Sequence, residues 1–323
     1  MSTIKDVAKL AGVSVATVSR VLNKNGYVHE DTLKKVERAI ELLNYKPSTV
    51  ARSLYNKSSR LIGLVVPNIL NPFFPEIARA VEDVAYKEGY TVVLCNSDEG
   101  LEKEKQYIDV LLRNNVDGFI VATNPQNSAN YMGLDVPVIA IDRVFNDHIP
   151  TVYADNYKGS KMAAELLLQK GCSHLAHIRG PRNISTANER YEGFLQAVTK
   201  TQISYVVAES PFELVASEQV AARLLEEHPE IDGIVAGNDL IAVSAVKAAL
   251  QKGIRIPDEL QVIGFDGISF TEMMFPSITT VAQPIYEMGE KATKLLIQHI
   301  EHGGGSKEHH CLPVNIIERN TTK

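Results

Sequence analysis

From Arg60 onwards, short apolar runs rich in Val, Ile and Leu alternate with amphipathic helical segments, and this alternation restricts the fold more than any other feature. The runs read LIGLVVPNI, YTVVLCNS, DGFIVAT, VPVIAID, HLAHIRG, DGIVAG and LQVIGFDG. The helical segments between them include residues 74–88, 102–115 and 158–170. Continuous apolar strands that alternate with helices are typical of parallel sheets covered on both faces. The pattern therefore predicts an α/β fold.

The length of this region suits two doubly wound parallel-sheet subdomains better than one. We expect the chain to cross between them near Asn156, near Pro284, and again before the last strand, PVNIIER. The predicted organisation is a helix-turn-helix domain at residues 1–46, a hinge helix and linker at 47–60, an N-subdomain at 61–156 plus 285–313, and a C-subdomain at 157–284 plus 314–323.

Charge is distributed unevenly along the chain. Residues 1–60 hold 11 Lys and Arg against 5 Asp and Glu, whereas residues 61–323 hold 22 against 34. A small basic region joined to a larger acidic one suggests that only the basic region meets a polyanion. Chance clustering of charge is the alternative.

The basic region has the helical period from its first residues. Thr3 can cap a first helix, Gly12 ends it, and Ser14 can cap a second helix. A third helix is expected over residues 31–44. Two short helices joined by a glycine-containing turn and followed by a third make an all-α helix-turn-helix unit. A three-helix bundle with a solvated polar face is the alternative.

The second predicted helix carries side chains suited to a DNA major groove. Val15 and Ala16 are small enough to let the helix lie deep in the groove, and the Thr17 methyl or hydroxyl can meet base edges. Arg20 has the planar fork that matches guanine O6 and N7. The basic excess and Arg20 favour DNA as the partner.

The segment KPSTVARSLYNKSSR follows, from Lys46 to Arg60. Val50, Ala51 and Leu54 can form one apolar edge of a helix that is too short to be stable alone in water. Such a segment can be ordered when it is bound, and Leu54 suits a wedge between base steps in a minor groove. From these residues alone, a solvated linker is the favoured interpretation.

TIKDVAKLAGVSVATVSRVLN, followed by NYKPSTVARSL, resembles the N-terminal signature of LacI/GalR-type bacterial repressors. That family reads an operator with the second helix and pairs two hinge helices of a dimer in the central minor groove. The resemblance implies a homodimer on palindromic operator DNA. It implies that Ala16, Thr17 and Arg20 read bases, that Leu54 is the wedge, and that Val15 and Ala51 belong to the same interface. It places Thr3, Ser14, Asn23 and Tyr45 at phosphates.

Polar and aromatic side chains follow the carboxyl ends of the predicted strands, where open parallel sheets bind ligands. They are Asn71, Phe73, Phe74, Asn124, Asp142, Arg143, Arg190, Phe212, Asn238, Asp266 and Gln283. Carboxylates, guanidiniums and amides match sugar hydroxyls, which both donate and accept hydrogen bonds, and aromatic rings stack on the apolar faces of a sugar. We therefore predict a sugar pocket walled by Phe73 and Phe74. The alternatives are helix-start core for the two rings and helix caps for the amides and carboxylates.

Residues 61–318 resemble the type I periplasmic sugar-binding fold, and NPFF, TNP, IDR, NERYEGF, GND, GFDG and AQP are similar in kind and order to its ribose-binding branch. The resemblance implies that ribose, or a phosphorylated relative, closes the cleft and lowers operator affinity. Ala154 stands where some relatives carry a sugar-contacting serine. A corepressor response, a phosphoprotein coregulator, a non-regulatory sugar-binding module and an enzyme stay open as alternatives.

Other motifs are absent from the sequence. It has no P-loop, G-x-S-x-G, HExxH or CxxC pattern, so we expect no catalytic residues, cofactor or metal site. The segment from His299 to Cys311 is interpreted as a glycine-rich loop, and the three cysteines as free thiols. No run of 18 apolar residues and no secretory leader is present, so we expect a cytoplasmic protein without a membrane segment. We expect no coiled-coil tetramer, because no heptad tail precedes Lys323.

Overall fold

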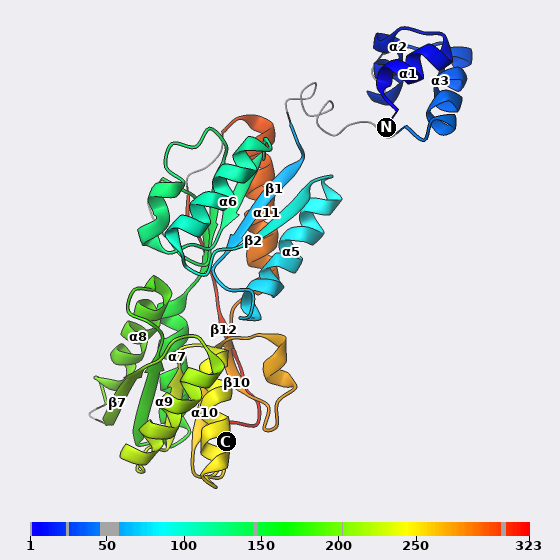
Figure 1. The fold of residues 1–323 in the computed structure, drawn as a ribbon. Helices are drawn as coiled ribbons and strands as arrows, with labels where there is room; N and C mark the ends of the chain where they lie inside the picture. The colour runs from blue at the N-terminus through cyan, green and yellow to red at the C-terminus, as the bar shows by residue number, and fades with distance from the viewer. Residues whose placement is uncertain (1, 24–25, 46–57, 145–147, 202, 305–307) are drawn as a thin grey trace. The chain divides into compact units, whose positions relative to one another are not determined.

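The computed structural model describes residues 2–23, 26–45, 58–144, 148–201, 203–304 and 308–323 (Figure 1). The chain separates into two compact units, Met1–Ser59 and Arg60–Lys323, which we call the head and the body. None of the helices in the described part combines the length and apolar character that a membrane span requires.

The head is a bundle of three helices around a small apolar core. Its helices are α1 (Ile4–Ala11), α2 (Val15–Asn23) and α3 (Glu30–Leu42). The buried apolar residues are Val7, Ala8, Ala11, Val18, Val36 and Ala39. They recur at helical spacing along the three helices, which explains why the sequence predicts the elements to within two residues.

Local capping sets the ends of the first two head helices. The Thr3 hydroxyl accepts a hydrogen bond from the Asp6 backbone N–H, and the Asp6 carboxylate accepts one from the Thr3 N–H at 2.7 Å. Gly12 ends α1 with a φ of 66°, in the left-handed region that favours glycine. The Ser14 hydroxyl accepts from the Thr17 N–H at 3.1 Å at the start of α2. All three predicted caps are confirmed.

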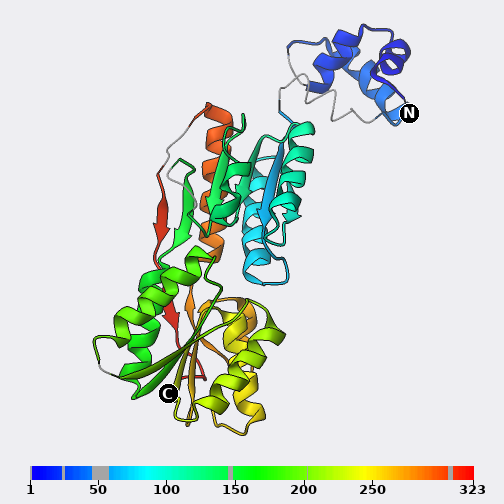
Figure 2. The same cartoon turned by 60° about the vertical axis from the view of Figure 1, so that its left-hand side comes forward.

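The body contains two six-stranded sheets, each with helices on both faces (Figures 1 and 2). The N-subdomain sheet has the order β11-β5-β4-β3-β1-β2 and is parallel throughout. Its elements are β1 (Leu61–Val66), α5 (Phe73–Lys87), β2 (Thr91–Asn96), α6 (Leu101–Arg113), β3 (Gly118–Val121), the 3-10 helix η1 (Pro125–Asn130), β4 (Val138–Ile141), β5 (Thr151–Ala154), α11 (Ile285–His302) and β11 (His310–Leu312).

The C-subdomain sheet has the order β12-β10-β9-β8-β6-β7, in which only β12 runs antiparallel to its neighbour. Its elements are α7 (Asn156–Gln169), β6 (His174–Arg179), α8 (Ser185–Val198), β7 (Ser204–Glu209), α9 (Leu214–Glu227), β8 (Gly233–Ala236), α10 (Asp239–Gln251), β9 (Gln261–Asp266), the 3-10 helix η2 (Ser269–Glu272), β10 (Thr279–Ala282) and β12 (Asn315–Ile317). Helices α7 and α8 pack so closely that a Cβ on Gly193 would lie 2.1 Å from Tyr157 O.

The chain passes between the two subdomains three times: between β5 and α7, between β10 and α11, and between β11 and β12. The backbone N–H of Asp155, at the first crossing, donates to Leu312 O, at the third, at 3.1 Å. A core cluster of buried residues continues through both subdomains and includes Phe73 of α5 and Phe265 of β9. The three crossings and this shared core join the two subdomains closely.

The structure corrects the interpretation of the segment from His299 to Cys311 and confirms the interpretation of the cysteines. The segment from His299 to Cys311 is not only a loop, because α11 continues to His302 and β11 begins at His310. The three-residue strand His310–Leu312 lacks the apolar run by which the longer strands were recognised. Cys95, Cys172 and Cys311 are free thiols, as predicted. The predicted hinge helix lies outside the described residues.

Candidate functional site

A cavity of about 190 Å³ lies between the two subdomains of the body, at the carboxyl ends of the strands. All of the predicted pocket residues line it except Asn124 and Gln283. From the N-subdomain these are Asn71, Phe73, Phe74, Asp142 and Arg143, and from the C-subdomain they are Arg190, Phe212, Asn238 and Asp266. Strand ends of two separate sheets therefore converge on one site.

Phe73 and Phe74 begin α5 and have exposed fractions of 3% and 5%. Their rings meet edge to face with centroids 5.2 Å apart. The Asn71 side chain positions them, because its Oδ1 accepts from the Phe73 N–H at 3.2 Å. Both rings belong to the body's core cluster and also line the cavity, so the two interpretations of the NPFF segment are compatible.

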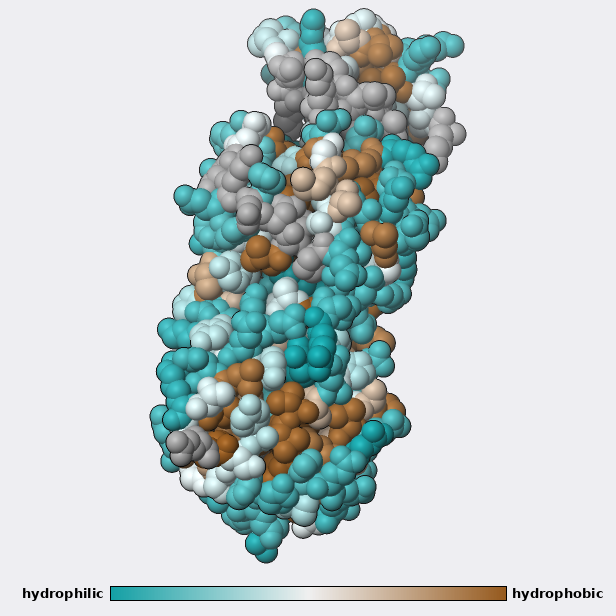
Figure 3. Space-filling model, turned by 90° about the vertical axis from the view of Figure 1, so that its left-hand side faces the viewer, coloured by the Kyte–Doolittle hydropathy of each residue, from teal (hydrophilic) through white to brown (hydrophobic). Residues whose placement is uncertain are grey.

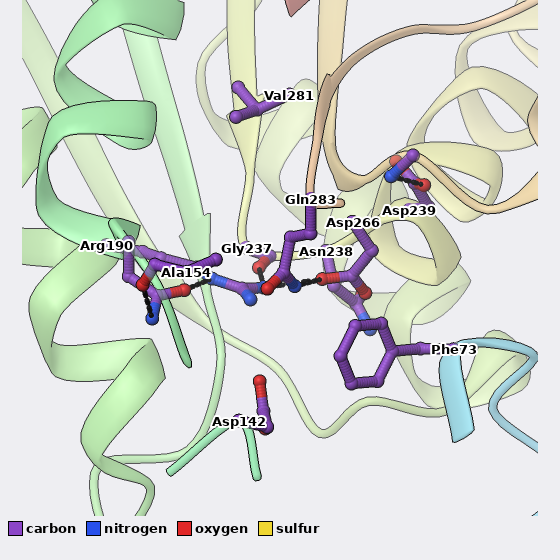
Figure 4. Close-up of polar contacts among 12 residues, drawn as sticks. Phe73, Asp142, Ala154, Arg190, Gly237, Asn238, Asp239, Asp266, Val281 and Gln283 are labelled. Atoms are coloured by element: carbon purple, nitrogen blue, oxygen red, sulfur yellow. Dashed lines mark hydrogen bonds and ion pairs between the residues drawn. The ribbon is translucent and has the colours of Figure 1, made fainter. Parts of the chain in front are cut away.

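Arg190 of α8 is buried and is held on three sides (Figure 4). Its Nε donates to Asn156 Oδ1 at 2.9 Å, and its Nη1 donates to Gly237 O at 2.7 Å. Nη1 also lies 3.1 Å from the Asp266 carboxylate, and the guanidinium stacks over the Phe265 ring at 3.8 Å. Within the described part of the chain, Nη2 has no hydrogen-bond acceptor, so its N–H groups can serve a ligand.

Asp266 is the last residue of β9 and pairs with both Arg190 and Gln283. Burial raises the pKa of its carboxyl to about 6 and outweighs the opposing effect of Arg190. Gln283 donates its Nε2 to Asp266 Oδ1 at 2.9 Å, while its own Oε1 is buried without a partner among the described residues. Gln283 thus supports Asp266 by a hydrogen bond and does not line the cavity.

Asp142 and Arg143 follow β4 on the N-subdomain side. Arg143 Nη1 donates to Glu99 Oε1 at 2.8 Å, and Arg143 Nε lies 3.4 Å from Asp142 Oδ2. Burial raises the pKa of Asp142, against the opposing effects of Arg143 and Arg190. Glu99 follows β2 and lines the cavity, although it is missing from the predicted set; the strand-end rule applies to it equally.

The two predicted strand-end asparagines outside NPFF act as helix caps. Asn238 Oδ1 accepts from the Ile241 N–H at 3.0 Å at the start of α10, and its Nδ2 is buried with no partner among the described residues. Because Asn238 also lines the cavity, this amide is suited to a ligand hydroxyl. Asn124 caps η1 and donates from Nδ2 to Asn183 O of the other subdomain at 3.3 Å. It therefore bridges the subdomains beside the cavity.

Two buried polar residues that support the site are also missing from the predicted set. Asp239 accepts from the backbone N–H groups of Gly267 and Ile268 and from Thr280, and so fixes the turn after Asp266. Asn156 holds Arg190 Nε. Both are the first residues of the helices that come after strands β5 and β8. GND and ADN read as ordinary helix starts, and no sequence signal distinguishes a residue that caps a helix from one that supports a binding residue.

The cavity combines hydroxyl-binding groups with aromatic walls. Four carboxylates line it, those of Glu99, Asp142, Glu213 and Asp266, together with the guanidiniums of Arg143 and Arg190. Such a set can bind a small molecule with several hydroxyls, because carboxylates accept and guanidiniums donate. Among the described residues, no group of three or more His, Cys, Asp or Glu side chains is arranged to hold a metal ion.

In the head, the predicted base-reading residues lie at the start and along one side of α2. Val15, Ala16 and Arg20 are exposed and Thr17 is partly exposed. The hydroxyls of Ser14 and Thr17 lie 2.9 Å apart. Thr3 is exposed and Tyr45 packs against the head core. The Asn23 side chain, Ala51 and Leu54 are outside the described residues.

Comparison with protein families matches both units. Residues 3–48 match the model of bacterial regulatory proteins of the lacI family. Residues 59–320 match the model of periplasmic binding proteins and the sugar-binding domain of the LacI family. A ribose operon repressor of Halalkalibacterium halodurans is 50% identical over 323 residues, covering 100% of this chain and 98% of that protein.

Solved structures show the same architecture. The lac repressor dimer bound to operator and an anti-inducer aligns with a TM-score of 0.89 at 29% identity, covering 99% of each chain. A LacI family transcriptional regulator from Enterococcus faecalis V583 with bound ribose aligns with a TM-score of 0.74 at 30% identity, covering 81% of this chain and 98% of that one.

Proposed function

Because the chain belongs to the LacI family of bacterial regulators, we propose that it is a ribose-responsive repressor of a sugar-utilisation operon. The head binds a palindromic operator, and a sugar in the cleft of the body lowers operator affinity. The observation that carries the proposal is the convergence of Arg190, Asp266 and the Phe73–Phe74 pair on one cavity in a chain that also has a helix-turn-helix head.

The size and chemistry of the cavity favour a single small sugar. A volume of about 190 Å³ is below the range of about 300–1,000 Å³ typical for drug-sized ligands. Unpartnered buried atoms, such as Asn238 Nδ2, offer hydrogen bonds that a hydroxyl can take up. Ribose is bound in the Enterococcus faecalis relative and named for the Halalkalibacterium halodurans relative, which supports it as the effector.

The active form is a homodimer in the cytoplasm, where bacterial DNA lies. The relative with operator DNA is a dimer, which supports this assembly. The body also exposes large apolar side chains that a second copy can cover, with exposed fractions of 70% at Val215, 82% at Met273 and 95% at Phe275. Separately from these residues, Figure 3 shows the face of the body that lies on the left-hand side of Figure 1, on which apolar side chains gather within a hydrophilic border.

The DNA-contacting residues follow from the same assignment. Arg20, Thr17 and Ala16 read base edges in the major groove, and Val15 lets α2 approach the groove closely. Thr3, Ser14, Asn23 and Tyr45 contact or orient phosphates, and Leu54 with Ala51 enters the minor groove. The cleft has no catalytic role, and the protein acts without a cofactor.

A thermal-shift panel followed by operator titration tests the function. The panel contains pentoses, hexoses, their phosphates and purines, because a true ligand raises the unfolding midpoint by mass action. D-ribose is expected to raise it and to weaken binding to an operator selected with the wild-type chain. A purine that raises the midpoint and strengthens operator binding would instead establish a corepressor response. No shift with any pentose, together with unaltered operator titrations, would overturn the proposal.

A further inference from the structure

Asn156 occupies a position that links the candidate sugar site to the first crossing between the subdomains. It is the first residue of α7 and has an exposed fraction of 1%. Its Nδ2 donates to Ala154 O, the last residue of β5, and to Glu189 Oε2, both at 3.1 Å. Its Oδ1 accepts from Arg190 Nε at 2.9 Å. Both amide hydrogens and the amide oxygen are thus engaged.

Arg190 is consequently connected to two of the three crossings. On one side, Asn156 joins its Nε to the end of β5. On the other side, its Nη1 lies 3.1 Å from Asp266 Oδ1, which also accepts from Gln283 at 2.9 Å. Gln283 follows β10 and precedes α11, at the second crossing. Figure 4 shows the row of polar contacts from the neighbourhood of Ala154 through Arg190 and Asp266 to Gln283.

A sugar that takes up Arg190 Nη2 and the Asp266 carboxylate would restrict the guanidinium from the cavity side. The side-chain amide of Asn156 would transmit this restriction to the first crossing, because it bonds both to Arg190 Nε and to the Ala154 carbonyl. We propose that Asn156 is a positioning residue that couples sugar binding to the angle between the subdomains. The inference rests on the proposed function, since the angle matters only if a sugar controls operator binding.

The coupling is measured as a ratio, with the full chain and with D-ribose as the probe. Fluorescence anisotropy gives the operator Kd without ribose and with saturating ribose, and their ratio is the coupling factor. Wild-type protein is expected to give a factor of about 5–150, the usual range for allosteric proteins. Calorimetry gives the ribose Kd, which determines saturation for each variant.

Asn156→Ala removes all three hydrogen bonds. Its coupling factor is expected to fall to within about twofold of one, even with ribose at saturation. Asn156→Asp preserves the volume and keeps an oxygen for Arg190 Nε, but its ionised carboxylate can donate neither to Ala154 O nor to Glu189 Oε2. It is expected to bind ribose more tightly than the alanine variant and still to lose coupling, so it tests the inference if the alanine variant fails to fold.

Asn188→Ala is the matched control. Asn188 lies on α8, accepts from Arg179 Nη2 and donates to Arg182 O, so it also joins an arginine but does so inside one subdomain. It is expected to lower the thermal midpoint and to keep the wild-type coupling factor. A purely structural role of Asn156 predicts the same behaviour for both positions.

The outcomes separate the two ideas. Loss of coupling in both Asn156 variants, with coupling kept in Asn188→Ala, supports the inference. Wild-type coupling in Asn156→Asp, or equal loss of coupling in Asn188→Ala, overturns it while leaving the proposed function intact. A wild-type coupling factor of one overturns the proposed function, and the inference with it.

Discussion

The head and the body hold their candidate functional residues in opposite ways. In the head, Val15, Ala16 and Arg20 are exposed and make no contribution to the apolar core. In the body, Arg190, Asp266 and Asn238 are buried and already bonded to other parts of the chain. We therefore expect that the candidate DNA-reading surface can change with little effect on the fold, whereas a change in the candidate sugar site also disturbs the structure that holds it.

The largest expected effect is that of Arg190→Ala. The change leaves the Asp266 carboxylate buried without its guanidinium partner, which typically costs about 3–5 kcal/mol of stability. The ribose response should be abolished, while the folded variant still binds operator. Denaturant unfolding and ribose calorimetry measure the two effects.

Arg182→Ala is the control for that experiment. Arg182 belongs to the same subdomain and pairs with Glu209 at 2.9 Å, but its side chain is 79% exposed. An exposed pair contributes about 0–1 kcal/mol, so stability and ribose affinity should stay close to wild type. A normal ribose response in Arg190→Ala would show that the sugar site is assigned wrongly.

Arg20→Ala tests whether an exposed residue of the head contributes to operator binding without contributing to stability. A bidentate contact to a base is worth about 1–3 kcal/mol, so operator affinity should fall by about 5- to 150-fold for each recognition helix at fixed salt. The unfolding free energy should change by less than about 0.5 kcal/mol, because the side chain is exposed. Anisotropy titration and chemical unfolding measure the two quantities. A large loss of stability would contradict the contrast between the units.

The pH dependence of ribose binding tests whether the buried carboxylate of Asp266 in the body takes part in binding the sugar. The pKa of Asp266 is raised to about 6, so this carboxylate, which we propose as an acceptor for sugar hydroxyls, is ionised at pH 7.5 and mostly protonated at pH 5. If only the ionised form binds ribose, affinity should fall by about tenfold between these two pH values. Calorimetry in two buffers of different ionisation enthalpy should detect proton release near pH 6 and little at pH 8. Affinity that rises towards pH 5 would argue against a carboxylate acceptor.

The smallest expected effect is that of Thr3→Ala. Loss of the capping box on α1 should cost the head about 1 kcal/mol, because Asp6 N–H loses its acceptor. Thr3→Ser keeps a hydroxyl and should behave like wild type. Hydrogen exchange should report faster opening of α1 and unchanged protection in the body. Equal loosening of both units would mean that they do not open independently.

The sequence allowed most of the fold to be predicted where local signals are strong. Thr3, Gly12 and Ser14 mark head helices through contacts within three residues, and long apolar runs mark the inner strands of both sheets. Strands β5, β7, β10 and β11 are missing from the predicted apolar runs. Strands β5, β10 and β11 are too short to show a pattern, and β7 (SYVVAE) carries polar residues at both ends. Short strands depend on pairing partners far away in the chain, which a local pattern does not contain.

The candidate cavity was predicted by a topological rule rather than by proximity in sequence. Carboxyl ends of parallel strands share one edge, so residues as distant as Asn71 and Asp266 could be grouped. The rule did not identify Asn156 as a site residue. Its partners Glu189 and Arg190 lie 33 and 34 residues further along the chain, and its position resembles a helix cap. A supporting role depends on side-chain direction, which strand order alone does not specify.

The antiparallel strand β12 completes the C-subdomain sheet with residues near the end of the chain, where Thr321 donates to Val262 O of β9. During translation, the head emerges first, as a contiguous unit with a small apolar core of its own. Both sheets of the body still lack an edge strand until β11 and β12 leave the exit tunnel. All of the residues that line the candidate cavity, from Pro67 to Asp266, are therefore synthesised before the sheets that position them have their last edge strands.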